Sequence, residues 1–156
     1  MEKHADLSIV ERSELVLPND TNLLGNLMGG RLMHSIDVVG AIAATKHAGH
    51  IVATAAMDHM DFRHPIKMGD LVTLCAKVIW TGRTSIQVRV KVYAENMIIG
   101  TKVLSNKAYI TYVALDSEGK PTPVPKVIVE DPEDIADFEK TQKLYLERKQ
   151  KEKNNK

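Results

Sequence analysis

Hydrophobic and polar positions alternate most clearly over residues 86–94. The apolar positions there are Ile86, Val88, Val90 and Val92, and the polar ones are Gln87, Arg89 and Lys91. A period of two predicts a β-strand with one buried and one solvated face. Further strand patterns occupy residues 7–17, 51–62, 71–81 and 102–115. Short turns separate the later strands, which favours a meandering antiparallel sheet.

Residues 31–47 carry the helical pattern of the chain. Gly29-Gly30 opens this segment, and Ala48-Gly49 is the expected stop signal. Its apolar residues cover almost the whole circumference, so we expect a helix that is buried on nearly every side. One long buried helix followed by antiparallel strands predicts an α+β fold, in which a curved sheet wraps the helix.

Alternate prolines at positions 121, 123 and 125 mark the expected end of the packed domain. Such a run continues neither a helix nor a central strand. We therefore expect one domain over residues 1–125 and a charged, helix-forming tail over residues 126–156. Phe138 and Tyr145 are the residues of this tail that would contact the domain or another subunit; a solvated helix is the alternative.

The composition narrows the function classes. The chain has 156 residues, a net charge of +1 and 4% aromatic residues. These values argue against a nucleic-acid partner, which would need a basic surface and stacking aromatics. The one cysteine allows no internal disulfide. The N-terminus is polar, and the longest apolar run, residues 38–44, is far shorter than the about 20 residues of a membrane span. We expect a soluble, cytoplasmic protein with no membrane partner.

Asp37 is the first candidate for chemistry, because it lies in the middle of an otherwise apolar helix. A carboxylate in such a place is costly unless it is paired, hydrogen-bonded or used. It is either a functional acid or an acid that meets amides or a basic group at an interface. His34 lies three residues earlier, so a His-Asp dyad and an exposed histidine are both open.

The loop before the helix offers a second group of candidates. Asn22 is either a turn residue or a polar group of a site. Gly29 and Gly30 would leave the N–H groups at the start of the helix unshielded, which suits an anion or a developing oxyanion. Close packing of the helix start against the sheet is the alternative.

The turn Gly82-Arg83-Thr84-Ser85 carries one guanidinium and two hydroxyls. This set is either a phosphate-binding turn or an ordinary polar hairpin turn. The six histidines show no ligand spacing, so no metal site is expected. Motifs for phosphate-binding loops, dinucleotides and serine nucleophile elbows are absent from the sequence.

Taken together, these segments resemble the acyl-CoA thioesterases of the hotdog fold, the group of brain acyl-CoA hydrolase and the bacterial YciA-type enzymes. The resemblance begins with the run from Asp20 to Asp37. It continues in order through residues 61–70, which start with Asp61-Phe62, then the turn at residues 82–85, and residues 113–121. It covers roughly residues 15–125. Asn26 is a mild departure, since many relatives have Asp there.

The resemblance implies a long helix wrapped by a curved antiparallel sheet. It implies homodimers whose sheets join edge to edge, commonly assembled as homohexamers that are trimers of dimers. The implied reaction is hydrolysis of acyl-CoA to a fatty acid and coenzyme A, with CoA only as part of substrate and product and no other cofactor. The implied catalytic residues are Asn22, Asp37 and Thr54.

These residues have distinct implied roles. Asp37 acts as general base or as nucleophile, and the sequence leaves this choice open. Asn22 and the amides at Gly29 and Gly30 polarise the thioester carbonyl, and Thr54 positions water or Asp37. The CoA phosphates are expected to contact the polar turn, with two further cations as helpers. These residues are Gly82, Arg83, Thr84 and Ser85, with Arg63 and Lys67.

Spacing adds one expectation about assembly. Asp37 lies about 12 Å along the helix from Gly29, at about 1.5 Å per residue, and Asn22 precedes the helix. The two side chains would therefore struggle to meet within one subunit, and we expect a composite site with Asn22 from one chain and Asp37 from another. Two rival functions share this fold class: a hydratase or dehydratase, for which His34 is a weak candidate base, and a non-catalytic acyl-CoA sensor.

Overall fold

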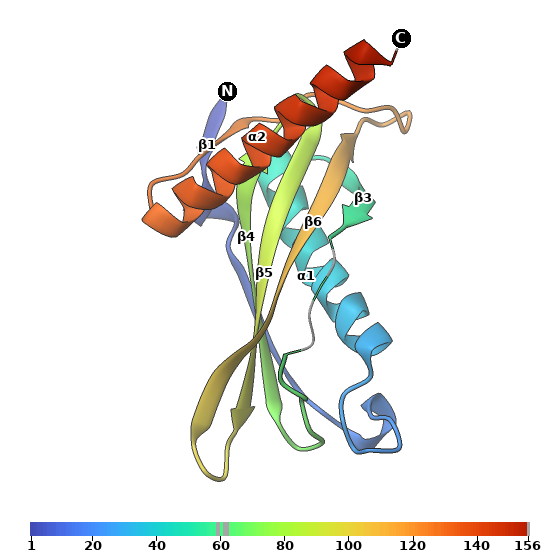
Figure 1. Ribbon diagram of the computed structural model, residues 1–156, viewed down its shortest axis with the longest axis vertical. Helices are drawn as coiled ribbons and strands as arrows, with labels where there is room; N and C mark the ends of the chain where they lie inside the picture. Colours follow the sequence, from blue (N-terminus) through green and yellow to red (C-terminus); the bar gives the residue numbers. More distant parts are fainter. Residues whose placement is uncertain (59, 61–62, 156) are drawn as a thin grey trace.

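A computed structural model describes residues 1–58, 60 and 63–155 (Figure 1). Its main sheet is antiparallel and five-stranded, in the order β2-β4-β5-β6-β3. The strands are β2 (Val10–Leu15), β3 (Ile51–Met57), β4 (Leu71–Thr81), β5 (Ser85–Asn96) and β6 (Thr101–Leu115). The sheet curls around helix α1 (Gly29–Ala48), so the predicted α+β fold is confirmed.

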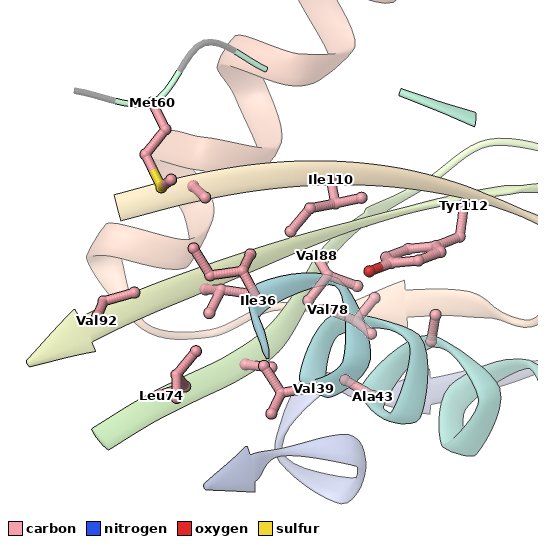
Figure 2. Close-up of a cluster of buried hydrophobic side chains, with 14 of the residues drawn as sticks. Ile36, Val39, Ala43, Met60, Leu74, Val78, Val88, Val92, Ile110 and Tyr112 are labelled. Atoms are coloured by element: carbon pink, nitrogen blue, oxygen red, sulfur yellow. The ribbon is translucent and has the colours of Figure 1, made fainter. Parts of the chain in front are cut away.

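The core lies between α1 and the concave face of the sheet (Figure 2). Ile36, Val39 and Ala43 of the helix are completely buried. The sheet residues in this cluster include Leu74, Val78, Val88, Val92, Ile110 and Tyr112. Burying one such aliphatic side chain contributes about 1.5–3 kcal/mol, so this layer holds the helix in place. Gly49 ends the helix in a left-handed conformation, φ 68°, as its position in the sequence predicted.

No described part of the same chain covers the outward face of α1. Met33 and Ile42 are 43% and 41% exposed, although the sequence predicted burial on nearly every side. That prediction is wrong for the single chain, because the sheet curls around only one side of the helix. The apolar side chains on the other side of the helix, such as Met33 and Ile42, are therefore partly exposed to solvent in the single chain.

Helix α2 (Pro132–Asn154) packs on the convex face of the sheet, opposite α1 (Figure 1). The Trp80 and Tyr145 rings lie 5.2 Å apart, and the Trp80 indole donates a hydrogen bond to Gln142 at 2.7 Å. Arg89 pairs with Asp134 and Asp137, each at 2.8 Å. The tail helix therefore contacts the domain and is not simply solvated.

This helix overturns the prediction that β5 has one solvated face. Gln87 and Arg89 are 7% and 6% exposed, because α2 covers them and supplies their partners. Thr141 donates to Gln87 at 2.5 Å, and the acids of α2 neutralise Arg89. The polar positions of the strand were read correctly, but they face another element instead of water.

Smaller differences concern the ends of the elements. Residues 7 and 8 belong to a 3-10 helix (Ala5–Ser8), so the first main strand begins at Val10. Strand β3 ends at Met57, and of the predicted strand 51–62, residues 59, 61 and 62 lie outside the described residues, as do Asp61-Phe62 of the family resemblance. A 3-10 turn (Pro18–Asp20) begins the predicted loop.

Beyond the proline run, a short strand β7 (Lys126–Ile128) pairs in parallel with β1 (Glu2–His4). The domain boundary at residue 125 stays a prediction, with α2 and β7 both contacting what precedes it. Within the described part of the chain, neither helix has both the length and the apolar character needed to cross a bilayer.

His47, in the last turn of α1, connects the helix to the proline run by a hydrogen bond. Its Nε2 lies 2.8 Å from the Pro125 carbonyl oxygen, and its Nδ1 is buried without a partner among the described residues. Burial lowers the pKa of His47 below its usual 6.5, although the bond to Pro125 acts in the opposite direction. The ring is therefore held neutral, with Nε2–H donating to Pro125.

We expect His47 to make the stability of the fold dependent on pH. Since its folded pKa lies below the unfolded value, its contribution is present above pH 6.5 and is lost as the pH falls through the folded value. Urea unfolding at about pH 7.5 and about pH 5 should show a larger loss for the wild type than for His47→Gln. The same substitution at His34, an exposed histidine of the same helix, serves as the matched control for the loss of one imidazole. Equal losses in wild type and His47→Gln would contradict the assignment.

Candidate active site

The Asp37 carboxylate is held at the outer edge of the sheet, where α1 passes β3 and β6. Its Oδ1 accepts hydrogen bonds from Thr54 Oγ1 at 2.9 Å and from the Tyr112 hydroxyl at 3.0 Å. The same Tyr112 hydroxyl lies 2.9 Å from the Asp37 main-chain oxygen. Asp37 is half-buried and Thr54 is exposed, so this group is open on the Thr54 side.

The pairing of the strands places both donors. Thr54 lies opposite Tyr112 in the β3–β6 ladder, just before an irregularity between Thr54 and Ala56. Burial and the nearby Asp37 charge raise the pKa of Tyr112 well above its usual value, so its hydroxyl stays protonated and donates. His34 is exposed and, among the described residues, makes no hydrogen bond to Asp37. The structure therefore gives the acid two hydroxyl partners and gives no support to a His-Asp dyad.

Asn22 occupies a separate loop before α1. Its Oδ1 accepts hydrogen bonds from the backbone N–H groups of Leu24 at 3.0 Å and Asn26 at 3.2 Å. This is the geometry of a turn residue, yet it directs the amide group so that Nδ2 has no partner among the described residues. The two readings of Asn22 are thus compatible, because the turn uses the oxygen and leaves the nitrogen as a free donor.

The loop that carries Asn22 is braced by the segment before β4. The N–H of Leu27 donates to the Ile66 carbonyl at 2.6 Å, and the N–H of Met68 donates to the Gly25 carbonyl at 3.0 Å. A hollow of about 260 Å³ lies between the two segments. Its lining includes Asn22, Gly29, Leu32, His64 and Asn106.

The start of α1 opens beside this hollow. Met28 precedes the helix and provides no side-chain cap, so the first N–H groups of the helix are left to other acceptors. A Cβ added at Gly30 would meet nothing within 4 Å. Gly30 is therefore not a close-packing glycine, and the reading of an accessible N-terminus is the one that fits.

The polar turn lies at the same end of the sheet as Asp37. Ser85 pairs with Val113, next to the Tyr112–Thr54 pair, which puts the turn about two strand spacings, or about 10 Å, from β3. Arg83 is exposed and lines a hollow of about 650 Å³ with Pro123 and Lys126.

The members of this turn do not converge on one hollow. Ser85 lines a smaller hollow, of about 180 Å³, beneath α2 with Arg148 and Lys149. The carbonyl of Thr84 accepts a hydrogen bond from Ala114, and the N–H of Gly82 donates to Ser85. The structure thus separates Arg83 from Ser85, which the sequence analysis grouped together.

Arg63 and Lys67 lie at the opposite end of the sheet, together with Asn22. Lys67 forms a bridge to Asn26, and the 11 residues of β4 then separate this end from the Gly82 turn, a span of about 35 Å. The predicted site residues therefore form two groups within one chain. Asp37, Thr54 and the polar turn make the first group, and Asn22, the helix start, Arg63 and Lys67 make the second.

Comparison with known proteins places the chain in a family. Residues 24–100 match the family model of the thioesterase superfamily. The chain is 43% identical over 128 residues to the uncharacterized acyl-CoA thioester hydrolase YkhA of Bacillus subtilis, covering 82% of this chain and 74% of that protein. The chain belongs to the acyl-CoA thioester hydrolases of the thioesterase superfamily.

Solved structures agree with this assignment. A Staphylococcus aureus acyl-CoA hydrolase, solved with butyryl-CoA, CoA and CoA disulfide, superposes with a TM-score of 0.88 at 35% identity, covering 99% of this chain and 94% of that one. An apo-hexameric acyl-CoA thioesterase superposes with a TM-score of 0.91 at 37% identity, covering 96% of each chain. The protein is thus an enzyme with the hotdog fold, as the resemblance implied.

Two residues of this thioesterase were missed in the sequence. Neither Tyr112 nor Gly40 was named as a candidate from the sequence. A Cβ at Gly40 would collide with the Tyr112 hydroxyl, so the two positions are coupled. The available signal was a phenol on a buried strand face, where its hydroxyl needs a partner.

Proposed function

We propose that this thioesterase hydrolyses acyl-CoA at a site shared by two subunits. One subunit supplies Asp37, Thr54 and the polar turn, and the other supplies Asn22 and the start of α1. The observation that carries the proposal is the Asp37 carboxylate, which has Oδ1 held by two hydroxyls and Oδ2 without a partner among the described residues. A carboxylate oxygen left free in this way is suited to take a proton from water or to attack a carbonyl.

The chemistry follows from these groups. In the general-base version, Oδ2 of Asp37 takes a proton from water while the water oxygen forms a bond to the thioester carbon. Asn22 Nδ2 and the amides near Gly30 donate to the oxygen that gains negative charge. The C–S bond then breaks, and the thiolate leaves. A thiol with a pKa of about 8.5 needs no dedicated acid to depart, which accounts for the small number of polar groups.

The residue types fit what is known of the Staphylococcus aureus relative. Structures exist of its variants in which one asparagine, one aspartate or one threonine is replaced by alanine, the asparagine variant with coenzyme A. These three positions have the same order and the same spacing as Asn22, Asp37 and Thr54. The agreement supports the choice of these three residues in this chain.

Assembly is the second part of the proposal. Strand β3 forms an outer edge of the main sheet, and the exposed apolar residues Met33 and Ile42 lie on the outward face of α1. A second copy joined along β3 would continue the sheet and cover this face. We propose a homodimer of this kind, and a homohexamer built as a trimer of dimers.

The CoA-binding role of the polar turn gives a separate prediction. Arg83→Ala should raise KM for an acyl-CoA about tenfold and leave kcat nearly unchanged, because the guanidinium would contact phosphate equally in the ground and transition states. Arg12, an exposed arginine on β2 that pairs with Glu14, provides the matched control. Steady-state kinetics of both alanine variants would check this, and a wild-type KM in Arg83→Ala would place the phosphates elsewhere.

The proposed activity is tested by thiol release from acyl-CoA substrates of increasing chain length. A thioesterase releases free thiol with at least one of them. An acyl-CoA sensor would bind the substrates without releasing thiol, and a hydratase would change an enoyl-CoA without releasing thiol. Either result would overturn the proposal.

A further inference from the structure

A buried tyrosine contacts the proposed catalytic acid from behind. We infer that Tyr112 is a positioning residue for the reaction, which fixes Asp37 through Oδ1 so that Oδ2 faces the substrate. The inference rests on the proposed role of Asp37. Tyr112 is completely buried, so it acts through Asp37 and does not contact the substrate itself.

The hydroxyl of Tyr112 is placed to hold Asp37 at two points. It lies 2.9 Å from the main-chain oxygen of Asp37 and 3.0 Å from its Oδ1. One hydroxyl proton is shared between the backbone and the side chain of the same residue, which ties the carboxylate to its own helix turn. Together with the bond from Thr54, this arrangement places both side-chain donors on Oδ1. Oδ2 is then the oxygen available for chemistry.

Gly40 leaves the space that the Tyr112 hydroxyl occupies beside Asp37. Glycine is a poor residue for the interior of a helix, and Gly40 lies in the middle of α1. A Cβ there would collide with the Tyr112 hydroxyl and would lie 3.2 Å from Cζ and 3.3 Å from Cε2 of its ring. The glycine at this position is thus explained by the access that it gives the phenol to Asp37.

Tyr112→Phe removes the hydroxyl and keeps the ring. We expect kcat for acyl-CoA to fall by about tenfold to a hundredfold, the usual effect of losing a hydrogen bond to a charged group, with KM within about twofold of wild type. The matched control is Tyr109→Phe. Tyr109 lies on the opposite face of β6 from Tyr112, and this substitution removes its 3.0 Å hydrogen bond to Asp137 of α2. That variant should keep the wild-type kcat. A wild-type kcat in Tyr112→Phe, or a loss in KM alone, would overturn the inference.

Gly40 gives a test by coupling. Gly40→Ala should lower kcat, because the new methyl group displaces the phenol. Adding Gly40→Ala to Tyr112→Phe should change kcat by less than about twofold, since the hydroxyl that is displaced is already gone. Additive losses in the double variant would show that the two positions do not act through one contact.

Asp37→Asn, assayed beside these variants, distinguishes a failure of the proposed role of Tyr112 from a failure of the proposed role of Asp37. If Asp37→Asn is inactive and Tyr112→Phe matches wild type, only the positioning role fails. If Asp37→Asn keeps the wild-type kcat, the proposed role of Asp37 fails and the positioning role fails with it.

Discussion

Asp37→Asn is expected to lower kcat for acyl-CoA hydrolysis by about a thousandfold while CoA still binds. General-base catalysis contributes about a hundredfold to ten-thousandfold. Asparagine keeps the shape of the side chain and an oxygen that can accept from Thr54 and Tyr112 in place of Oδ1. It replaces the free Oδ2 by an amide nitrogen, which neither accepts a proton nor attacks a carbonyl. The substitution therefore removes the reacting atom and leaves its surroundings intact.

The measurement combines steady-state thiol release with CoA titration by calorimetry. Asp131→Asn serves as the control, because this aspartate lies at the start of α2 and pairs with Lys77 on the convex face. It should keep both turnover and CoA binding. If Asp37→Asn turned over acyl-CoA at the wild-type rate, another group would have to be the base or nucleophile.

The sequence predicted the layers of the fold because they depend on local periodicity. The alternation in β5 and β6 and the helical spacing in α1 gave the two sides of the core. The solvated face of β5 was wrong for a different reason. Gln87 and Arg89 are polar but covered, because α2 lies far along the chain and brings its own partners to them. The pattern of a short segment indicates which side chains are polar, but it does not indicate whether a distant element covers them.

The site residues also differ in how far the sequence could reveal them. Asp37 was apparent from the sequence, since a carboxylate in an apolar helix needs a reason. Asn22 stayed open between a turn residue and a site residue until the family resemblance gave it a role. Thr54 was named only through that resemblance, because it is ordinary in its local context. Tyr112 was found by neither route, because its contact with Asp37 depends on how α1 packs against β6 and on the glycine at position 40 of that helix. These are tertiary relations that no spacing in the sequence expresses.

The composite site makes a second large prediction. Asn22→Ala and Asp37→Asn subunits should each be nearly inactive alone, since one removes the proposed oxyanion donor and the other the reacting carboxylate. When the two are unfolded together and refolded, half of the dimers are mixed. In each mixed dimer one site receives both intact residues, so about a quarter of all sites should recover. A site built within one chain would show no recovery, because each subunit would still carry one defect.

The reciprocal mixture removes the remaining ambiguity. A subunit with both substitutions, refolded with an equal amount of wild type, leaves every site of a mixed dimer with one missing residue. Activity should then fall to about a quarter of that of an equal number of wild-type sites, instead of the half expected for independent chains. The geometry favours the lower value, because the residues that line the hollow beside Asn22 come from the loop before α1, the first turn of α1, the segment before β4 and β6, and Asp37 is not among them. Recovery in the first mixture and inhibition in the second would together require that Asn22 and Asp37 meet across two chains.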